Sequence, residues 1–267
     1  MTIFQAIVLG VLQGLAEFLP ISSSAHLTLA PWIFGWQDPG LAFDVALHAG
    51  TLLALAWYFR VEWTALIRAG FSILRTRAIQ TPIERRLLLL VIASIPGGIA
   101  GKLLNDYAES AFRAPTLIAI ALMVMGVLLW AADKWGKQQR ELGDVTVRDA
   151  VLIGFAQVFA LIPGVSRSGS TMTAGRALGF DRQSAARFSF LMSLPITTAA
   201  VAVKLPEAVQ AHADLAPMIA GIIAAAVSGW MAIAVLLKVL TRYSFGSFAL
   251  YRLALGALVL GLVAMRS

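Results

Sequence analysis

The 267-residue sequence contains no cysteine and few charged residues. The absence of cysteine excludes disulfide bonds and thiolate metal sites, and it leaves the redox compartment undefined. Only 13% of the residues are charged and 59% are hydrophobic, whereas soluble globular domains have about 25% and about 45–50%. With a mean hydropathy of +0.82, this balance excludes an ordinary soluble domain and predicts a membrane protein with several helical spans.

The sequence also lacks a basic start and a compact basic block. Residues 1–20 have no positively charged stretch ahead of their apolar run, so we infer no cleavable signal peptide. The net charge of +7 is distributed between hydrophobic runs, as charges that orient membrane segments are. Nucleic acid is therefore not an expected partner.

Six runs are apolar and long enough to cross a bilayer, which takes about 20 residues. The segments after the first and third runs are rich in arginine and lysine, so we expect them in the cytoplasm, and we expect the segment after the second run outside. The six runs are Leu41–Phe59, Leu87–Leu104, Pro115–Ala132, Ser184–Leu205, Pro217–Leu240 and Phe248–Met265.

Two segments, Thr2–Trp36 and Val147–Phe180, do not fit as spans. Each starts apolar, is broken by a proline and a hydroxyl-rich stretch, and then resumes a helical pattern. Neither arm reaches across a bilayer of about 30 Å at about 1.5 Å per residue. Irregular backbone survives at membrane depth only where protein or a wet cavity covers it. We therefore predict two re-entrant helical hairpins with their tips near the midplane.

The two hairpins resemble one another in sequence. A shift of 144 residues aligns Gly10 with Gly154 and Gln13 with Gln157, and sets "SSSA" against "SRSG". Each half of the chain then holds one hairpin and three crossings. Because an odd number of crossings brings the chain to the opposite face of the membrane, the second half is expected to have the opposite orientation, as in an inverted-topology repeat. The alternative is a chance resemblance between two helix breaks rich in glycine and serine.

The expected fold is an all-α integral membrane protein with six transmembrane helices and two re-entrant hairpins. It forms a single membrane domain, residues 1–267, whose repeat halves are approximately 1–135 and 145–267.

The hairpin tips offer the chemistry of an anion site. A helix begins at each tip, so free N–H groups and the positive end of a helix dipole point into the shared space. Arg167, at the second tip, would be costly inside a membrane without a role, and its planar fork suits phosphate. The alternative for the serines is helix capping. The candidate phosphate-binding residues are Ser22 and Ser24 at the first tip, and Ser166, Arg167, Ser168 and Thr171 at the second.

Four side chains at the first tip suggest reactivity. Gln13 and Glu17, four residues apart, share one helix face, and their oxygens are ligands of the kind that magnesium or calcium takes. The alternative is a structural Glu17–Arg167 ion pair, and the two are compatible. Ser23 and His26 are three apart, and a hydroxyl beside an imidazole is the minimum for an activated nucleophile. Spacing alone leaves open that His26 is merely hydrogen-bonded.

The stretches "QGLAEFLPISSSAH" and "PGVSRSGST" resemble the two signature regions of the undecaprenyl-diphosphate phosphatases, the bacitracin-resistance family of bacterial inner-membrane enzymes. The family pattern is Glu or Gln, three residues and Glu, then Pro-x-Ser-Ser-x-x-His, and later Pro-Gly-x-Ser-Arg-Ser-x-x-Thr. Gln13 takes the permitted alternative to glutamate, so the resemblance does not require two carboxylates. The matching residues are Gln13, Glu17, Pro20, Ser22, Ser23, His26, Pro163, Gly164, Ser166, Arg167, Ser168 and Thr171.

The resemblance implies hydrolysis of undecaprenyl diphosphate to the monophosphate and inorganic phosphate, which recycles the lipid carrier for peptidoglycan synthesis. It also implies a divalent-cation requirement, magnesium or calcium, and an active site in the inner membrane that opens toward the periplasm. A polyprenyl diphosphate and membrane lipid are the expected partners, and a homodimer is a further possibility.

Together these residues suggest a mechanism. Arg167 and the N–H groups of the tips hold the diphosphate, while Glu17, helped by Gln13, positions the cation. Ser23 attacks the terminal phosphorus with His26 as its base, and water then releases phosphate. One alternative makes His26 the nucleophile, as in another lipid-phosphatase superfamily. The other is a transporter or flippase for a phosphorylated polyprenyl lipid, since transporters also use broken helices.

Overall fold

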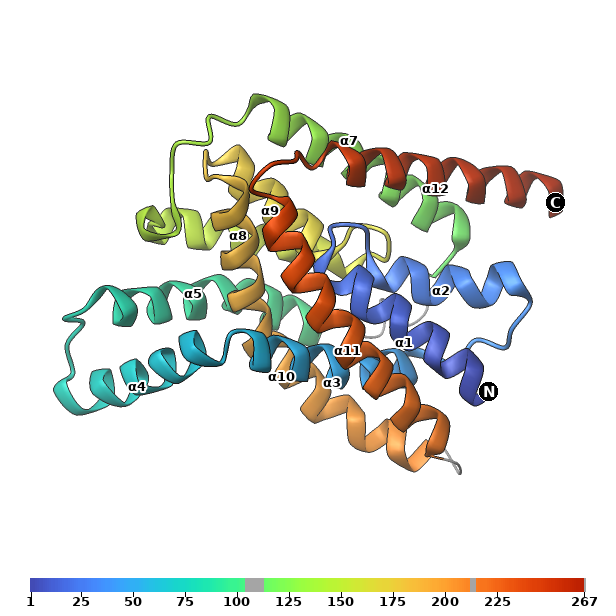
Figure 1. Cartoon of the computed structure of the whole chain (residues 1–267), viewed down its shortest axis with the longest axis horizontal. Helices are drawn as coiled ribbons and strands as arrows, with labels where there is room; N and C mark the ends of the chain where they lie inside the picture. Colours follow the sequence, from blue (N-terminus) through green and yellow to red (C-terminus); the bar gives the residue numbers. More distant parts are fainter. Residues whose placement is uncertain (104–112, 212–214, 267) are drawn as a thin grey trace.

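The computed structural model describes residues 1–103, 113–211 and 215–266 (Figure 1). Within these ranges the regular structure is helical, and one isolated bridge pairs Arg140 with Phe180. The prediction of an all-α protein is therefore confirmed. The helices are α1 (Ile3–Phe18), α2 (Ser23–Phe34), α3 (Leu41–Tyr58), α4 (Arg60–Thr76), α5 (Pro82–Leu103), α7 (Pro115–Trp135), η1 (Leu142–Asp144), α8 (Val147–Val158), η2 (Phe159–Leu161), α9 (Arg167–Ala177), α10 (Arg182–Ala211), α11 (Ala216–Val239) and α12 (Gly246–Arg266).

Five of the described helices, α5, α7, α10, α11 and α12, are long and apolar enough to cross a membrane. A sixth crossing is formed if α3 and α4, which meet at an 84° bend, count as one broken span. This agrees with the six predicted runs and confirms an integral membrane protein. Leu104, the last residue of the second predicted run, lies outside the described residues.

α4 differs from the arginine-rich connection expected after the first run. Residues Arg60–Thr76 form a helix that lies beside α5 and antiparallel to it (Figure 1). Leu66 and Ala69 are buried, while Arg68 and Arg75 on other faces are exposed. The helix is amphipathic, and its polar face lowers the average hydropathy. A search for continuous apolar runs therefore misses it.

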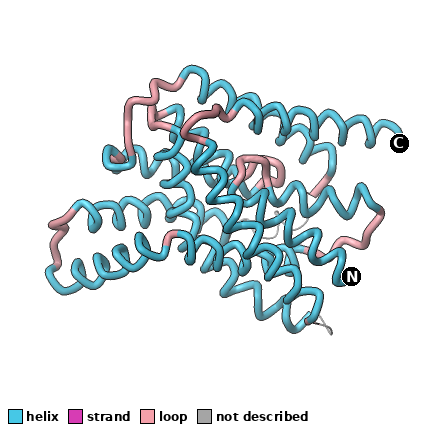
Figure 2. The backbone as a smooth tube through the Cα atoms, in the orientation of Figure 1, coloured by secondary structure: helices cyan, strands magenta, loops and turns pink. Residues whose placement is uncertain are grey.

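Two helical hairpins occupy the predicted broken segments. The first consists of α1 and α2, with 16 and 12 residues, and the second of α8 and α9, with 12 and 11 residues. Their connecting loops lie near the centre of the molecule (Figure 2). Helices this short fall below the roughly 20 residues of a span, so the helix breaks lie where the sequence predicts them. Their depth in the bilayer stays a prediction.

Matching close contacts recur in the two hairpins. α1 packs on α11 at Gly10, where an added Cβ would lie 2.2 Å from the Gly221 carbonyl oxygen. α8 packs on α5 at Gly154, where a Cβ would lie 2.6 Å from the Ala93 carbonyl oxygen. Only glycine allows helices to approach this closely. A repeat would duplicate such contacts, but the inverted arrangement of the two halves and their place in one domain stay predictions.

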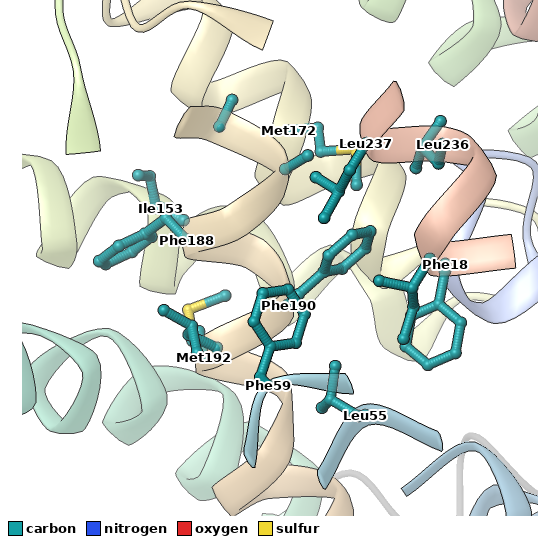
Figure 3. Close-up of a cluster of buried hydrophobic side chains, with 14 of the residues drawn as sticks. Phe18, Leu55, Phe59, Ile153, Met172, Phe188, Phe190, Met192, Leu236 and Leu237 are labelled. Atoms are coloured by element: carbon teal, nitrogen blue, oxygen red, sulfur yellow. The ribbon is translucent and has the colours of Figure 1, made fainter. Parts of the chain in front are cut away.

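The main core cluster joins both hairpins to α3 and α10 (Figure 3). The ring of Phe190 in α10 packs edge-on against Phe18 at the end of α1, with ring centroids 5.4 Å apart. The same ring lies 6.2 Å from that of Phe59, directly after α3. Met172 of α9 belongs to the same cluster. Close packing of side chains holds helices together inside a bilayer, so the cluster holds the hairpins against the bent span.

A buried carboxylate ties together the ends of α7 and α9 and the starts of α10 and α12. Asp133 Oδ1 accepts hydrogen bonds from Arg176 Nε and Arg182 Nε, each at 2.8 Å. Its Oδ2 accepts one from the N–H of Phe245 at 3.0 Å. Arg176 is fully buried, and a guanidinium that is paired with a carboxylate in the interior becomes costly when that partner is removed.

Replacing this carboxylate is expected to destabilise the protein strongly. Asp133→Asn should lower the free energy of unfolding by about 3–5 kcal/mol, because it leaves a buried guanidinium without its counterion. The matched control is Glu62→Gln, which breaks an ion pair with Arg187 at 3.3 Å whose side chains are 30% and 48% exposed. That change should cost about 1 kcal/mol or less. Unfolding midpoints in detergent measure both, and equal losses would contradict the prediction.

Candidate functional site

The two hairpin tips are hydrogen-bonded to each other. Ser22 Oγ accepts the N–H of Gly164 at 3.1 Å, and Ser168 Oγ donates to the carbonyl oxygen of Leu19 at 3.2 Å. Ser22 and Ser166 are the N-caps of α2 and α9, and each Oγ accepts an N–H of the first turn. Both caps have positive φ, 74° and 73°, which is uncommon for serine. These side-chain bonds hold the two tips in one polar junction.

Arg252 of α12 holds the same junction from the side. It is fully buried, and its Nη1 donates to the Pro20 carbonyl oxygen of the first tip at 2.9 Å. Its Nη2 donates to the carbonyl oxygens of Gly164 at 2.6 Å and Val165 at 3.0 Å, in the second tip. Its Nε donates to Leu122 O in α7 at 3.0 Å. One guanidinium therefore satisfies carbonyl groups that both helix breaks leave without helical partners.

Sequence reasoning missed Arg252, although a signal was present. Arg252 lies inside the predicted crossing Phe248–Met265. An arginine inside a span has a role by default, and the argument made for Arg167 applies to it equally.

Glu17 is the centre of the reactive group. It is 8% exposed, and its Oε1 forms an ion pair with Arg167. Its Oε2 accepts the Ser23 hydroxyl at 2.7 Å and the Gln13 Nε2 at 3.2 Å. His48 Nε2 lies 3.4 Å from the same oxygen. The two hairpins and α3 thus converge on one carboxylate, and the Glu17–Arg167 ion pair weighed from the sequence is present.

These groups border a cavity of about 240 Å³. One part of its lining carries the acid, the arginine and hydroxyls, and another part is apolar. Polar groups placed at one point of an apolar cavity suit a ligand with a charged head and a hydrocarbon chain. The polar lining residues are Glu17, Ser23, Ser24, His48, Gln157, Ser166, Arg167 and Thr197, and the others are Val45, Gly97, Ala160, Leu161, Ile196 and Ala200.

The Ser23 hydroxyl and the Glu17 carboxylate have the geometry of a nucleophile and its base. Ser23 is the first residue of α2, so it stands at the positive end of that helix. Its proton already points at Glu17 Oε2, 2.7 Å from the hydroxyl oxygen, which is within the range for general-base catalysis. The arrangement supports transfer of the serine proton to glutamate.

His26 is not joined to Ser23, although spacing had suggested that pair. Its Nδ1–H donates to the Ser22 carbonyl oxygen at 2.6 Å, one helical turn back, and its Nε2 lies 2.6 Å from the Tyr251 hydroxyl. The two rings stack at 5.7 Å. In this geometry both ring nitrogens are engaged and His26 is not part of the described cavity lining. Nothing local in the sequence marks Tyr251 as its partner.

The predicted phosphate-binding residues divide into two groups. Ser24, Ser166 and Arg167 line the cavity. The hydroxyls of Ser22 and Ser168 instead form the hydrogen bonds that join the two tips. Thr171 Oγ1 bonds to the Arg167 carbonyl oxygen at 2.8 Å within its own helix. Hydroxyls near a helix start commonly bond to the backbone in this way. The capping alternative holds for Ser22 and also for Ser166, each of which is an N-cap, while Ser168 and Thr171 bond to the backbone without capping a helix.

The predicted metal ligands offer few oxygens. Gln13 turns its Nε2 toward Glu17, and its Oε1 is buried without a hydrogen-bond partner among the described residues. No group of three or more His, Cys, Asp or Glu side chains that could hold a metal occurs in the described part of the chain. Glu17 borders the cavity, whereas Gln13 is fully buried and is not part of the described lining. The Glu17 carboxylate and the Gln13 amide oxygen would leave most ligand positions of a hard cation to phosphate and water, as magnesium allows. They do not form an all-protein cage.

Two cavity residues were not among the predicted site. His48 Nδ1–H donates to the Asp44 carbonyl oxygen at 2.8 Å, which turns Nε2 toward Glu17. Gln157 Nε2 donates to the Ala93 carbonyl oxygen at 2.8 Å, and its Oε1 has no partner among the described residues. A histidine inside a predicted span, and the alignment of Gln157 with Gln13, were the available signals.

The chain is similar to one protein family over nearly its whole length. A family model described as bacitracin resistance protein BacA matches residues 6–258. The chain is similar to the undecaprenyl-diphosphatase of Gemmatimonas aurantiaca, with 61% identity over 267 residues and 100% of both chains covered. It is 51% identical over 266 residues to that of Pelotomaculum thermopropionicum, covering 100% of this chain and 98% of that one. That of Moorella thermoacetica is 50% identical over 266 residues, with 100% of both covered.

Loss of the guanidinium at the hairpin junction is expected to destabilise the fold. Arg252→Met should lower the free energy of unfolding by about 3 kcal/mol or more, because each buried carbonyl left unpaired costs about 1–3 kcal/mol. Arg252→Lys should lower the free energy of unfolding by a smaller amount than Arg252→Met, because an ammonium keeps the charge but lacks the fork that reaches several carbonyls. The control is Arg266→Met at the exposed end of the same helix, where the guanidinium lies 4.3 Å from the Trp32 ring; it should cost about 1 kcal/mol or less. Thermal unfolding in detergent compares the three, and a wild-type midpoint for Arg252→Met would contradict the assignment.

Proposed function

Because the chain belongs to the bacitracin resistance protein BacA family, we propose that it hydrolyses undecaprenyl diphosphate to undecaprenyl phosphate and inorganic phosphate. The Ser23 hydroxyl bonded to Glu17, beside Arg167 at one cavity, is the observation that carries the reaction. The relatives named as undecaprenyl-diphosphatases support the substrate. The chain is then a membrane phosphatase that returns the lipid carrier to peptidoglycan synthesis.

Substrate binding begins with an exchange of partners at Arg167. The diphosphate brings oxygens that compete with Glu17 for the guanidinium, and Arg167 presents the planar fork that phosphate accepts. Ser24 and Ser166, which line the same cavity, add hydroxyl donors. The starts of α2 and α9 add the positive ends of two helix dipoles. Fixed donors of this kind stabilise the charge that develops on the transferring phosphoryl group.

Two steps complete the hydrolysis. In the first, Ser23 Oγ forms a bond to the terminal phosphorus while its proton passes to Glu17 Oε2. The bond from that phosphorus to the bridging oxygen breaks, and undecaprenyl phosphate leaves with the electron pair. In the second, a water molecule attacks the phosphoserine, its proton goes to the serine oxygen through Glu17, and phosphate is released. Glu17 thereby takes the role first assigned to His26, because it lies against the hydroxyl and His26 does not.

A divalent cation, magnesium or calcium, belongs to this proposal. The buried Gln13 Oε1, which lacks a partner among the described residues, and the Glu17 carboxylate are the protein oxygens that would hold it with the diphosphate. When bound, the cation neutralises charge on the phosphate oxygens.

The proposal places the enzyme in the bacterial inner membrane with the cavity open toward the periplasm. The alternation of basic and less basic connecting segments supports this orientation. The prenyl chain leaves the cavity past its apolar side, which includes Val45, Ile196 and Ala200. A homodimer is part of the same proposal, and the molecular mass in detergent measures it.

Removing the nucleophile or its base is expected to abolish hydrolysis. Ser23→Ala and Glu17→Gln should each lower phosphate release from undecaprenyl diphosphate by about 10²-fold or more, since each loses the proton transfer. Ser244→Ala, in the exposed connection before α12, is the matched control and should keep wild-type turnover. Purified protein in detergent is the test material. No release by the wild type with any polyprenyl diphosphate would instead leave lipid transport as the function.

Trapping of the phosphoenzyme decides between the two nucleophiles. An acid-stable adduct on Ser23 is expected, because phosphoserine survives acid. An acid-labile adduct on His26, or near wild-type turnover by Ser23→Ala, would end the serine mechanism.

The cation requirement has its own test. A chelator should suppress phosphate release, and added magnesium or calcium should restore it. Gln13→Leu should raise the concentration of cation needed for half-maximal activity, because it removes one oxygen ligand. An unchanged cation dependence in Gln13→Leu would remove Gln13 from the site.

A further inference from the structure

A second cavity lies at the opposite end of α5 from the active site. Its volume is about 340 Å³, and it is enclosed by the α4–α5 connection, the start of α5, the η1 segment and α10. In Figure 1 this is the region where the chain turns from α4 into α5, away from the hairpin tips. The described linings of the two cavities share no residue, so this is a separate place in the fold.

The lining of this second cavity is amphiphilic. One part consists of apolar side chains from four segments, and the other part is basic and polar. Such a division matches a ligand with an anionic head and a hydrocarbon body. The apolar residues are Ile79, Pro82, Leu89, Leu142, Val145 and Phe188, and the others are Gln80, Thr81, Arg85, Arg86 and Gly143.

Neither arginine of the lining has a counterion among the described residues. Arg85 Nη2 donates to the Val145 carbonyl oxygen at 3.2 Å, and Arg86 makes no hydrogen bond or ion pair with any described residue. The nearest acid in sequence, Glu84, does not neutralise them. Its Oε2 accepts the N–H groups of Gln80 at 2.6 Å and Thr81 at 2.9 Å, so it stabilises the turn into α5. The cavity therefore has two positive charges left to pair with an anion.

The position of these arginines favours a lipid as the anionic ligand of the cavity. They lie in the first turns of α5, directly ahead of the apolar run Leu87–Leu90 of a helix long enough to cross the membrane. The start of an apolar span is where the hydrocarbon core of a bilayer meets its headgroups. The positive end of the α5 dipole lies at the same point. The arginine-rich connections belong to the side of the membrane where anionic lipids attract basic segments.

We propose that this cavity binds the phosphate headgroup of an anionic phospholipid, with Arg85 and Arg86 on the phosphate. The glycerol and first methylene groups lie against Leu89 and Phe188. Free phosphate offers nothing to the apolar part, and a zwitterionic phospholipid carries an ammonium that the two arginines repel. The bound lipid contacts α5, the η1 segment and α10 together, and so connects the three segments around the cavity.

Binding of lipids to the purified protein in detergent tests the proposal. Phosphatidylglycerol, phosphatidylcholine and inorganic phosphate are titrated separately, with native mass spectrometry and the unfolding midpoint as readouts. Phosphatidylglycerol should bind saturably and raise the midpoint, whereas phosphatidylcholine should not. Inorganic phosphate has its own proposed site in the active-site cavity, so any binding of it should be equally tight in the wild type and in the variant described next. The double variant Arg85→Gln/Arg86→Gln should bind phosphatidylglycerol about tenfold more weakly or worse, because it loses charge-assisted hydrogen bonds.

The matched control removes the same charge from a neighbouring surface. Arg68→Gln/Arg75→Gln lies on exposed positions of α4, outside the cavity, and should bind phosphatidylglycerol as the wild type does. If both double variants bound phosphatidylglycerol equally weakly, the lipid would be attracted by the basic surface as a whole, and the proposed site would be wrong. Binding of inorganic phosphate that weakens in Arg85→Gln/Arg86→Gln as much as binding of phosphatidylglycerol does would show a site for free phosphate and contradict the lipid.

A third variant adds bulk to the cavity lining without changing its charge. Gly143 lines the cavity, and a Cβ added there meets nothing within 4 Å. Gly143→Trp should therefore weaken phosphatidylglycerol binding about tenfold with both arginines intact, and unchanged binding would contradict the proposed place. Phosphate release by each variant in phosphatidylcholine bilayers, expected at the wild-type rate, shows that the variants are folded.

Discussion

The hydrogen bonds from Arg252 to the carbonyl groups of both hairpin tips are the contact on which the site depends. A helix that breaks inside a membrane leaves carbonyls that neither water nor lipid can satisfy. One guanidinium reaches Pro20, Gly164 and Val165, which is possible only when the two tips touch. The same proximity brings Glu17 of the first hairpin against Arg167 of the second. The hydrogen bonds that satisfy these backbone carbonyls thereby also bring together the acid, the hydroxyl and the arginine of the proposed reaction.

In the proposed mechanism, Glu17 links substrate binding to reaction because its two oxygens have different partners. Oε1 is paired with Arg167, while Oε2 accepts the Ser23 hydroxyl. A ligand without strongly accepting oxygens cannot draw Arg167 away from the carboxylate, so neutral lipids gain little by entering the cavity. A diphosphate has the charge to do so, and in the proposed mechanism it brings its phosphorus to the Ser23 hydroxyl. Selectivity and activation then arise from one exchange of partners.

The sequence predicts local features of this protein and misses distant pairings. Proline and clustered hydroxyls mark both helix breaks, because those residues act within a few positions of the chain. Apolar runs mark the spans, while the amphipathic Arg60–Thr76 lacks such a run and escapes. The Glu17–Arg167 pair was foreseeable because two opposite charges inside a membrane need each other. His26 was assigned to Ser23 from spacing, but its partner Tyr251 lies 225 positions away, where no local pattern reports it.

The distance along the chain between Arg252 and the first tip also constrains biosynthesis. Pro20 and Arg252 are 232 residues apart, so the first hairpin leaves the ribosome long before the helix that completes it. Until α12 is inserted, the carbonyl of Pro20 lacks this donor and requires water or the insertion machinery as a substitute. The first hairpin is thus among the earliest segments to be made and among the last to reach its final contacts. A truncated chain that ends before α12 has all of Gln13, Glu17, Ser23 and Arg167, yet it lacks the side chain that locks the two tips together.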